Sequence, residues 1–225
     1  MVALSEREHA LRQHMEPGRG VYDTQRAAAL AGVPASTLRH WAHTGLYTPS
    51  ISPEPRARLW SWADLLALRA IDWFRKGDIE RTRVGVADLR HALADLEAVG
   101  YAREDLAQIL AISGADGKFY FQLPGKVIRI HAGEQLAIAE TLHLVAPYKQ
   151  APDLLQPRPL LRIIPGKLHG EPHISGTRIP TRTIGALHRA SYSLQQIQTM
   201  YPDATSAALN EAIEFERSLL PTTTA

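Results

Sequence analysis

Hydrophobic and polar positions along the first third of the chain follow the pattern of a helix-turn-helix. An alanine-rich segment after Thr24 is small and apolar enough for two helices to cross closely, and Gly32 suits a sharp turn. Leu38 supplies an apolar contact that would fix a second helix, beginning with Ser36, across the first. Asp23 or Thr24 can cap the first helix, because either side chain accepts a hydrogen bond from free amides of the first turn.

A wing and a longer helix are expected next. Prolines interrupt the loop over residues 49–55, which leads into a basic segment over residues 56–60 and is typical of a wing. Ser61 can cap a helix over residues 62–75, whose apolar residues form one broad face. We therefore predict a winged helix-turn-helix domain over residues 1–77.

A hydrophobic stripe marks the helix expected after the wing. Val86, Leu89, Leu93 and Leu96 recur at spacings of three, four and three, which places them on one face of a helix over residues 84–99. Such a stripe can pair two subunits, or it can simply seal its own domain. A separate argument favours a homodimer, because one helix-turn-helix rarely reads enough base pairs and two-fold symmetry doubles the site.

The centre of the chain, residues 78–145, combines helices with a β-hairpin. Residues 103–112 favour a further helix, whereas residues 118–130 carry β-formers on both sides of a Pro-Gly turn. A hairpin alone is too small to be stable. We expect it to pack on a helix over residues 134–145 or to pair with a strand at residues 160–164.

A proline-rich segment separates this centre from the C-terminal part. Its prolines and its lack of periodicity predict a linker over residues 146–159. A strand at residues 161–165 and a glycine-rich loop follow, and then three helices over residues 183–190, 193–200 and 205–219. A short turn before a longer third helix predicts a homeodomain-like three-helix module over residues 160–225. The whole chain is thus predicted to be mainly α with small β elements.

Composition indicates an ordinary globular protein. The chain has 225 residues, 45% of them hydrophobic and 21% charged, which fits two or three small domains. No apolar run reaches the length of a membrane span and no signal-like segment starts the chain, so we expect a cytoplasmic protein without membrane association. The absence of cysteine excludes disulfides, thiolate metal sites and thiol catalysis.

Charge is distributed unevenly along the chain. Residues 1–77 carry ten Lys or Arg against seven Asp or Glu, residues 78–157 carry eight against eleven, and residues 158–225 carry seven against five. The chain is therefore basic at both ends and acidic in the middle. Basic ends suit contact with phosphates, and an acidic centre suits protein contact or solvation.

The second helix of the helix-turn-helix carries the candidate DNA contacts. Ser36 and Thr37 place hydroxyls at its start, where they can bind phosphates or base edges. Arg39 follows on the exposed side, where a guanidinium can bind a guanine edge or a phosphate. The residues predicted to contact DNA are Thr24, Ser36, Thr37, Arg39, His40, Trp41, Arg56 and Arg58.

The stretch from Tyr22 to Ile71 carries a family resemblance. The residues that support it are Ala28, Gly32-Val33, Thr37-Leu38-Arg39, Trp41, Gly45-Leu46, Pro49, Arg58-Leu59-Trp60, Asp64-Leu65 and Leu68. In their order and spacing they resemble the winged helix-turn-helix of MerR-type regulators. The resemblance implies binding to double-stranded operator DNA; the alternative is a small helical module that only packs on a partner.

The C-terminal part carries a second resemblance, over residues 170–181 and several positions downstream. The residues are Gly170-Glu171-Pro172-His173-Ile174-Ser175-Gly176-Thr177-Arg178-Ile179-Pro180-Thr181, Ser193-Leu194-Gln195-Gln196-Ile197, Tyr201-Pro202 and Ala212-Ile213. They resemble a bacterial and archaeal family known only as a domain of unknown function, whose members are commonly placed among antitoxins. With its MerR-like head, the chain resembles a VapB-type antitoxin that represses its own operon, which implies a VapC-like PIN-domain ribonuclease as toxin partner.

This resemblance also suggests how a toxin would be held. PIN-domain toxins bind a divalent cation in a carboxylate cluster, and an arginine can compete there because its fork matches carboxylates. Arg178 is the first candidate for toxin binding, followed by Arg162 and Arg182. The alternative is that Arg178 forms a structural ion pair or caps carbonyls within its own loop.

Other chemical motifs are weak. His169 and His173 are four residues apart, but they lie in a loop rich in glycine and proline, where that spacing carries no ligand geometry. No motif activates a nucleophile, so we expect no cofactor, no metal and no enzymatic activity. Two alternatives stay open: a MerR-like regulator that senses a small molecule without a toxin, and a nuclease that uses His169, Glu171 and His173.

Overall fold

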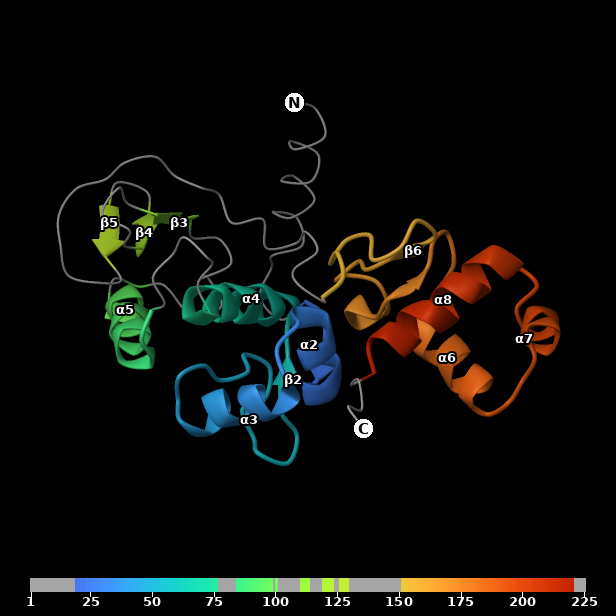
Figure 1. Ribbon diagram of the computed structural model, residues 1–225, viewed down its shortest axis with the longest axis horizontal. Coiled ribbons are helices and arrows are strands. Elements are labelled where there is room, and N and C mark those ends of the chain that lie inside the picture. Colours follow the sequence, from blue (N-terminus) through green and yellow to red (C-terminus); the bar gives the residue numbers. More distant parts are fainter. Residues whose placement is uncertain are drawn as a thin grey trace, which may run out of the picture.

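The computed structural model describes residues 19–76, 84–98, 100 and 151–220, and the backbone of residues 110–113, 119–123 and 126–129. These residues are mainly helical, with small antiparallel sheets (Figure 1), which confirms the predicted fold class. A helical head and a C-terminal helical module lie side by side and are joined by hydrogen bonds.

The helix-turn-helix is formed by α2 (Thr24–Ala31) and α3 (Ala35–His43). Asp23 caps α2 by accepting a hydrogen bond from the Arg26 amide at 2.8 Å. Gly32 ends the helix with a positive φ of 72°, a conformation that costs glycine little. The predicted cap and turn are therefore confirmed.

The predicted wing is built on a short antiparallel pairing. β1 (Tyr22–Asp23) pairs with β2 (Leu59–Trp60), and Ser52 forms a further bridge to Leu59. α4 (Trp62–Lys76) begins directly after β2. The loop between Ser52 and Leu59 thus extends from the sheet as a hairpin, and the strand before α2 anchors it.

Asp64 connects the wing to α4. Its carboxylate accepts hydrogen bonds from the Ser61 amide at 2.7 Å and from the Tyr47 hydroxyl at 2.8 Å, and its own amide bonds the Ser61 hydroxyl. Ser50 adds two donors to the same carboxylate. This fully buried acid completes the predicted Ser61 cap and fixes the start of the wing loop.

The core of the head is dominated by large aromatic side chains. Apolar residues of α2, α3 and α4 bury Trp41, Trp60, Trp62 and Phe74 almost completely. The rings of Tyr47 and Trp60 stack with centroids 6.4 Å apart. This aromatic core fixes α3 against α4.

α5 (Val86–Ala98) shows how the leucine stripe is used. Leu89, Leu93 and Leu96 are buried within the chain, while Val86 is 38% exposed. α5 also contacts the nearby strand β5 (Lys126–Arg129). The stripe therefore seals its own domain, and its leucines are not free to pair a second subunit.

The central sheet has the strand order β3–β4–β5. β4 (Phe119–Leu123) and β5 (Lys126–Arg129) form the predicted hairpin, in which Leu123 pairs with Lys126. Two expectations were wrong: β3 (Leu110–Ser113) is a strand rather than a helix end, and it takes the sheet edge expected for residues 160–164. Strands that are close in sequence usually pair with each other. The helix expected at residues 134–145 lies outside the described residues.

The C-terminal module begins with β6 (Leu161–Arg162), which pairs with β7 (His173–Ile174) across a loop that contains the 3-10 turn η2 (Leu168–Gly170). Its helices are α6 (Thr181–Arg189), α7 (Leu194–Met200) and α8 (Ser206–Ser218). A capping box of Ser193 and Gln196 starts α7. α8 lies between α6 and the small sheet (Figure 1) and contacts both.

The predicted linker is packed over the part that the structure describes. Ala151, Asp153 and Leu154 are buried, and Asp153 accepts hydrogen bonds from the two amides at positions 155 and 156. Arg69 of α4 donates a hydrogen bond to the Pro152 carbonyl at 2.6 Å. Residues 151–159 are therefore a structural part of the head–module contact, because Leu154 supplies the apolar anchor that a free linker lacks.

Candidate nucleic-acid interface

The outer face of α3 is open to solvent. Ser36, Arg39 and His40 are exposed and Thr37 is half-buried, whereas Leu38 points into the core. Helical periodicity separates these two faces. A groove of double-stranded DNA is wide enough to admit a helix that presents hydroxyl and guanidinium groups in this way.

Trp41 does not belong to this face. It is 1% exposed and lies in the core, so the prediction that it contacts DNA was wrong. Arg75 of α4 lies over its ring, with the guanidinium carbon 5.6 Å from the ring centroid. Trp41 supports α3 from inside.

Thr24 and the wing arginines differ in how accessible they are. The Thr24 hydroxyl accepts a hydrogen bond from the Trp60 indole at 3.2 Å, which holds it half-buried beside the wing. Arg56 is fully exposed on the wing loop. Arg58 is half-buried, and its Nε has no hydrogen-bond partner among the described residues. Of the wing arginines, Arg56 is the better placed for a phosphate.

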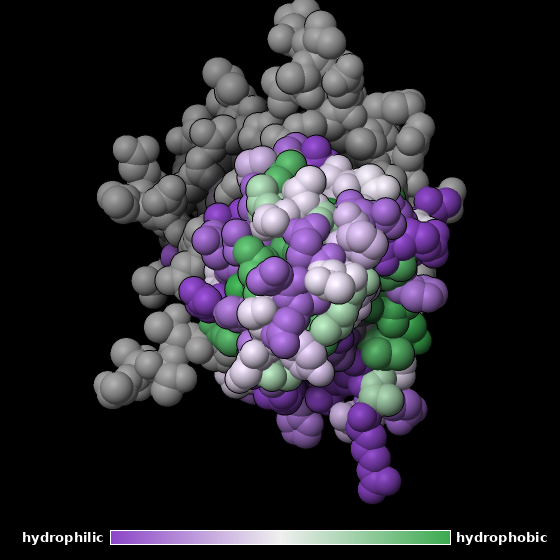
Figure 2. Space-filling model, turned by 90° about the vertical axis from the view of Figure 1, so that its right-hand side faces the viewer, coloured by the Kyte–Doolittle hydropathy of each residue, from purple (hydrophilic) through white to green (hydrophobic). Residues whose placement is uncertain are grey.

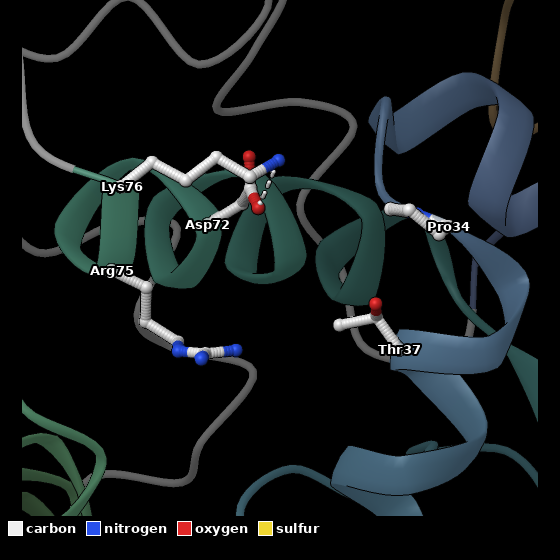
Figure 3. Close-up of a pocket in the computed structure, with 5 residues that line it drawn as sticks. All are labelled: Pro34, Thr37, Asp72, Arg75 and Lys76. Carbon is white, nitrogen blue, oxygen red and sulfur yellow. Dashed lines mark ion pairs between the residues drawn. The ribbon is translucent and has the colours of Figure 1, made fainter.

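A cavity of about 280 Å³ lies beside the start of α3. It is lined by Pro34, Thr37, Asp72, Arg75 and Lys76 (Figure 3). The Lys76 ammonium pairs with Asp72 at 2.7 Å, so one of the two lining cations is already neutralised. Three of its five lining residues are charged, and its volume is modest for a small-molecule site.

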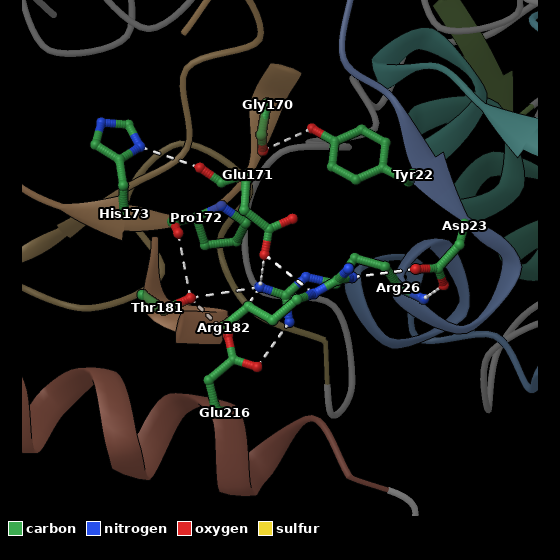
Figure 4. Close-up of polar contacts among 10 residues, drawn as sticks. All are labelled: Tyr22, Asp23, Arg26, Gly170, Glu171, Pro172, His173, Thr181, Arg182 and Glu216. Carbon is green, nitrogen blue, oxygen red and sulfur yellow. Dashed lines mark hydrogen bonds and ion pairs between the residues drawn. The ribbon is translucent and has the colours of Figure 1, made fainter. Parts of the chain in front are cut away.

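The strongest polar cluster in the described residues joins the head to the module, and the sequence analysis missed it. Arg26 of α2 is 5% exposed and donates to both carboxylate oxygens of Glu216, at 3.0 and 2.8 Å (Figure 4). It also donates to Glu171 at 2.7 Å and to the Thr181 hydroxyl at 3.4 Å. One guanidinium thus binds two carboxylates of the module in a charge-assisted, partly bidentate arrangement.

Backbone contacts surround this cluster. The Tyr22 hydroxyl donates to the Gly170 carbonyl at 2.9 Å, and the Val21 amide donates to the His169 carbonyl at 2.8 Å. Gly170 has a positive φ of 79°, and a side chain there would collide with the Tyr22 hydroxyl. The loop before β7 therefore fits closely against β1 of the head.

The pKa values of the residues in this cluster are shifted by burial and by the neighbouring charges. Burial, with the charge of Glu171, raises the pKa of the Tyr22 phenol well above its usual range. Burial opposes the charge on Arg26, but Glu171 and Glu216 outweigh it and keep the pKa of the guanidinium above its usual value. Burial also raises the pKa of Glu171, although Arg26 and Arg182 act in the other direction. The cluster is an ion-pair network shielded from water.

The three arginines predicted to bind a toxin lie in different surroundings. Arg182 pairs with Asp23 of the head at 3.2 Å and with Glu171 at 3.5 Å. Arg162 donates to the carbonyls of Pro159 and Leu161, at 2.9 and 2.7 Å. Arg178 is exposed, and its guanidinium has no recorded hydrogen bond or ion pair with a described residue. Only Arg178 is therefore presented to a partner without an internal contact that must first be broken.

A spacing in the sequence could have revealed Arg26. Arg26 lies one helical turn before Leu30 on α2, and Tyr22 lies in β1 just before this helix; all three side chains are buried. A charged residue between two apolar ones on a buried face requires a partner. The identity of the partners could not be deduced, because Glu171 and Glu216 are distant in sequence.

The described residues give no sign of a metal centre or a membrane segment. They contain no group of three or more His, Asp or Glu side chains that could hold a metal ion. His169 is exposed, whereas His173 is buried, with its Nδ1 3.1 Å from the Glu171 carbonyl. Among the described helices, none is both long and apolar enough to cross a bilayer.

Comparison with known proteins identifies two domains. A family model described as MerR HTH family regulatory protein matches residues 22–84, and a model described as protein of unknown function (DUF433) matches residues 162–215. A MerR-family helix-turn-helix domain and a DUF433 domain are thus present, and the former suggests a DNA-binding regulator. No curated protein matches the chain.

One crystal structure, of Rv2018 from Mycobacterium tuberculosis, aligns with the chain. The alignment has a TM-score of 0.39 and 16% identity, and it covers 88% of this chain and 97% of that one. A superposition of this quality does not by itself establish a common fold.

Proposed function

We propose that this chain, with its MerR-type head, is a non-enzymatic repressor that binds operator DNA as a homodimer and serves as the antitoxin of a VapC-like PIN-domain ribonuclease. The DNA-binding part of this proposal rests on one observation. The outer face of α3 stays exposed although the C-terminal module is packed on α2 through Arg26. The module therefore leaves the reading helix accessible.

The chemistry of this face suits DNA. The hydroxyl of Ser36 can bind a phosphate near the start of α3, and Arg39 follows three residues later on the same exposed side. Arg56 on the wing can reach a neighbouring phosphate. Arginine is the side chain that most often recognises guanine in the major groove. We assign base reading to Arg39 and phosphate contact to Ser36 and Arg56.

The antitoxin part is supported by the C-terminal motif and by Arg178. The motif resembles a family whose members are commonly placed among antitoxins. Arg178 presents an exposed guanidinium from the loop before α6, between Gly176 and Pro180. A guanidinium in such a loop can enter a carboxylate-lined pocket and replace the charge of the cation there. Arg162 and Arg182, which are bound within the chain, are secondary contacts.

The cavity beside α3 does not add support for the alternative of a regulator that senses a small molecule. The cavity beside α3 has about 280 Å³, which is at the lower end of the range for ligand pockets. Its lining includes three charged side chains, and two of them already pair with each other. Nothing in this cavity selects an organic ligand.

The DNA-binding proposal is tested with the promoter region of the chain's own gene. Arg39→Ala should weaken the free energy of DNA binding by about 1–3 kcal/mol. Arg56→Ala should reduce the slope of log K against log salt by about 1, the value expected for the loss of one phosphate contact. Fluorescence anisotropy at several salt concentrations measures both effects. Arg178→Ala is the matched control and should bind DNA like the parent chain. Parent-like binding by both Arg39→Ala and Arg56→Ala would contradict the assignment.

The antitoxin proposal is tested by co-purification from the native host. A ribonuclease should elute with the tagged chain in stoichiometric amount and be identified by mass spectrometry. In the purified complex, Arg178→Ala should release ribonuclease activity, whereas Arg39→Ala should leave the enzyme inhibited. A chain that purifies without any protein partner, under conditions that preserve complexes, would refute the antitoxin part and leave the DNA-binding part standing.

A further inference from the structure

A long stretch of the C-terminal module is free of acidic residues. Residues 172–202 contain Arg178, Arg182 and Arg189 but no Asp or Glu. The module's carboxylates lie outside this stretch, at Glu171, Asp203, Glu211, Glu214 and Glu216. The surface built by α6 and the start of α7 is therefore basic and carries no carboxylate of its own to repel an anion.

Helical spacing aligns two of these arginines. Arg182 and Arg189 are seven residues apart on α6, so they lie on the same face, separated by about 10.5 Å along the helix axis. Both are exposed, and exposed Ala186 lies between them. Ile184 and Gly185 face α8 instead, and a Cβ on Gly185 would be 2.8 Å from the Cβ of Glu216. The Arg182–Ala186–Arg189 stripe thus lies on the exposed side of α6, with the Arg189 guanidinium beside Gly185 and the Arg182 guanidinium paired with Asp23 and Glu171.

The stripe begins at the edge of the DNA-binding head. The Arg182 guanidinium pairs with Asp23 at 3.2 Å, and Asp23 caps the first helix of the helix-turn-helix directly before Thr24. This pairing offsets a half-exposed carboxylate that would otherwise repel phosphates at that edge. Arg26 donates to Thr181, the first residue of α6, and to Glu216 of α8, against which α6 packs, and these buried bonds fix the position of α6 relative to the head. DNA that contacts the predicted site at Thr24 would therefore lie near Arg182, whose partner Asp23 is the neighbour of Thr24 in the chain.

We infer that the Arg182–Ala186–Arg189 stripe is a second DNA-contact surface, which binds phosphates flanking the segment read by α3. This inference rests on the proposed DNA binding and extends it to the module. The separation of about 10.5 Å equals about three nucleotides of rise along one strand, so Arg189 can meet one phosphate directly, and Arg182 can meet another by exchanging its ion pairs with Asp23 and Glu171. Ala186 lets the helix approach the backbone closely between them.

The surroundings favour DNA over a protein partner. Protein interfaces usually have an apolar core with aromatic and methionine side chains. The Arg182–Ala186–Arg189 stripe itself holds no aromatic or methionine side chain; Tyr192 and Met200, which are 40% and 47% exposed, follow it in the chain, and the end of the module shown in Figure 2 mixes polar and hydrophobic positions. A basic stripe beside a DNA-binding head matches the charge of a phosphate backbone.

The test measures the salt dependence of binding to the promoter duplex between about 50 and 200 mM salt. Arg189→Gln should reduce the slope of log K against log salt by about 0.9, and the double variant Arg182→Gln/Arg189→Gln by about twice that. At about 0.1 M salt the single change should weaken binding about 8-fold. Arg158→Gln, which removes the same charge on the β6 side of the module, should keep the parent slope. Unchanged unfolding midpoints confirm that the variants fold.

Each remaining outcome has a distinct meaning. If both stripe variants keep the slope of the parent and of Arg158→Gln, the inference is refuted while DNA binding by the head stands. If they bind DNA like the parent but lose a co-purifying protein, the stripe is a protein surface and the inference is overturned. If the parent itself does not prefer promoter DNA over a scrambled duplex, the proposed function fails and the inference fails with it.

Discussion

Replacing Arg26 with methionine isolates the energetic role of the head–module network. Methionine keeps most of the length of the side chain but removes its charge and all its hydrogen bonds. Glu216, whose side chain is 7% exposed, would then be left without a cation, and Glu171, 17% exposed, would keep only Arg182 at 3.5 Å. Removing one partner of a buried ion pair typically costs about 3–5 kcal/mol. The total free energy of unfolding of a small protein is about 5–15 kcal/mol, so this loss would remove a large part of the stability.

The chain offers a convenient assay, because its four tryptophans all lie in the head, at positions 41, 60, 62 and 73. Urea unfolding followed by tryptophan fluorescence therefore reports on the head, whereas far-UV circular dichroism also reports on α6, α7 and α8. In the parent the two transitions should coincide, because head and module share one buried network. In Arg26→Met the transitions should separate, and the module transition should move to lower urea.

Two controls make the result specific. Arg39→Met, the same substitution at an exposed position, should change the free energy of unfolding by less than about 0.5 kcal/mol. Adding Glu216→Gln to Arg26→Met should recover part of the loss, because the carboxylate that lost its cation is removed. If Arg26→Met costs less than about 1 kcal/mol and both transitions still coincide, the network does not hold the two domains together, and the reasoning is refuted.

Two further substitutions test the surroundings of this network. Gly170→Ala should destabilise the chain by about 2 kcal/mol or more in urea unfolding, because φ is 79° and the new methyl group would collide with the Tyr22 hydroxyl; a neutral effect would contradict the close fit. Burial lowers the pKa of His173, so the stability linked to this residue is present above about pH 6.5 and is lost as the pH falls through its folded pKa. In the parent chain the free energy of unfolding should decrease as the pH falls from about 7.5 to 5.5, and His173→Gln should make this decrease smaller. An unchanged decrease would mean that other groups cause the pH dependence.

Local signals in the sequence predicted much of the fold. The Asp23 cap, the Gly32 turn and the Ser193 cap depend on neighbouring residues, and all three are present. The hairpin around the Pro-Gly turn is likewise a local feature, and it forms with the expected pairing of Leu123 and Lys126. Elements whose geometry is set within a few residues were therefore accessible without a structure.

Tertiary contacts explain where the sequence analysis failed. An aromatic residue on the second helix of a helix-turn-helix can face either DNA or the core, and only the tertiary packing of α3 shows that Trp41 is buried. Residues 151–159 have the composition of a linker, but Arg69 and the burial of Leu154 hold them in place. Arg26 stayed unnoticed because its acceptors are 145 and 190 residues away. Partners at such separations leave no pattern in a single sequence.

The position of Arg26 also bears on how this protein can be divided. A cut in the proline-rich segment near residue 150 follows the apparent domain boundary in the sequence, yet it would separate Arg26 from both of its carboxylates. The truncated head would expose a hydrophobic and charged surface around Tyr22 and Arg26 that is buried in the full chain. Its solubility and DNA affinity would then reflect this new surface. The smallest fragment that preserves the native head is one that retains the module.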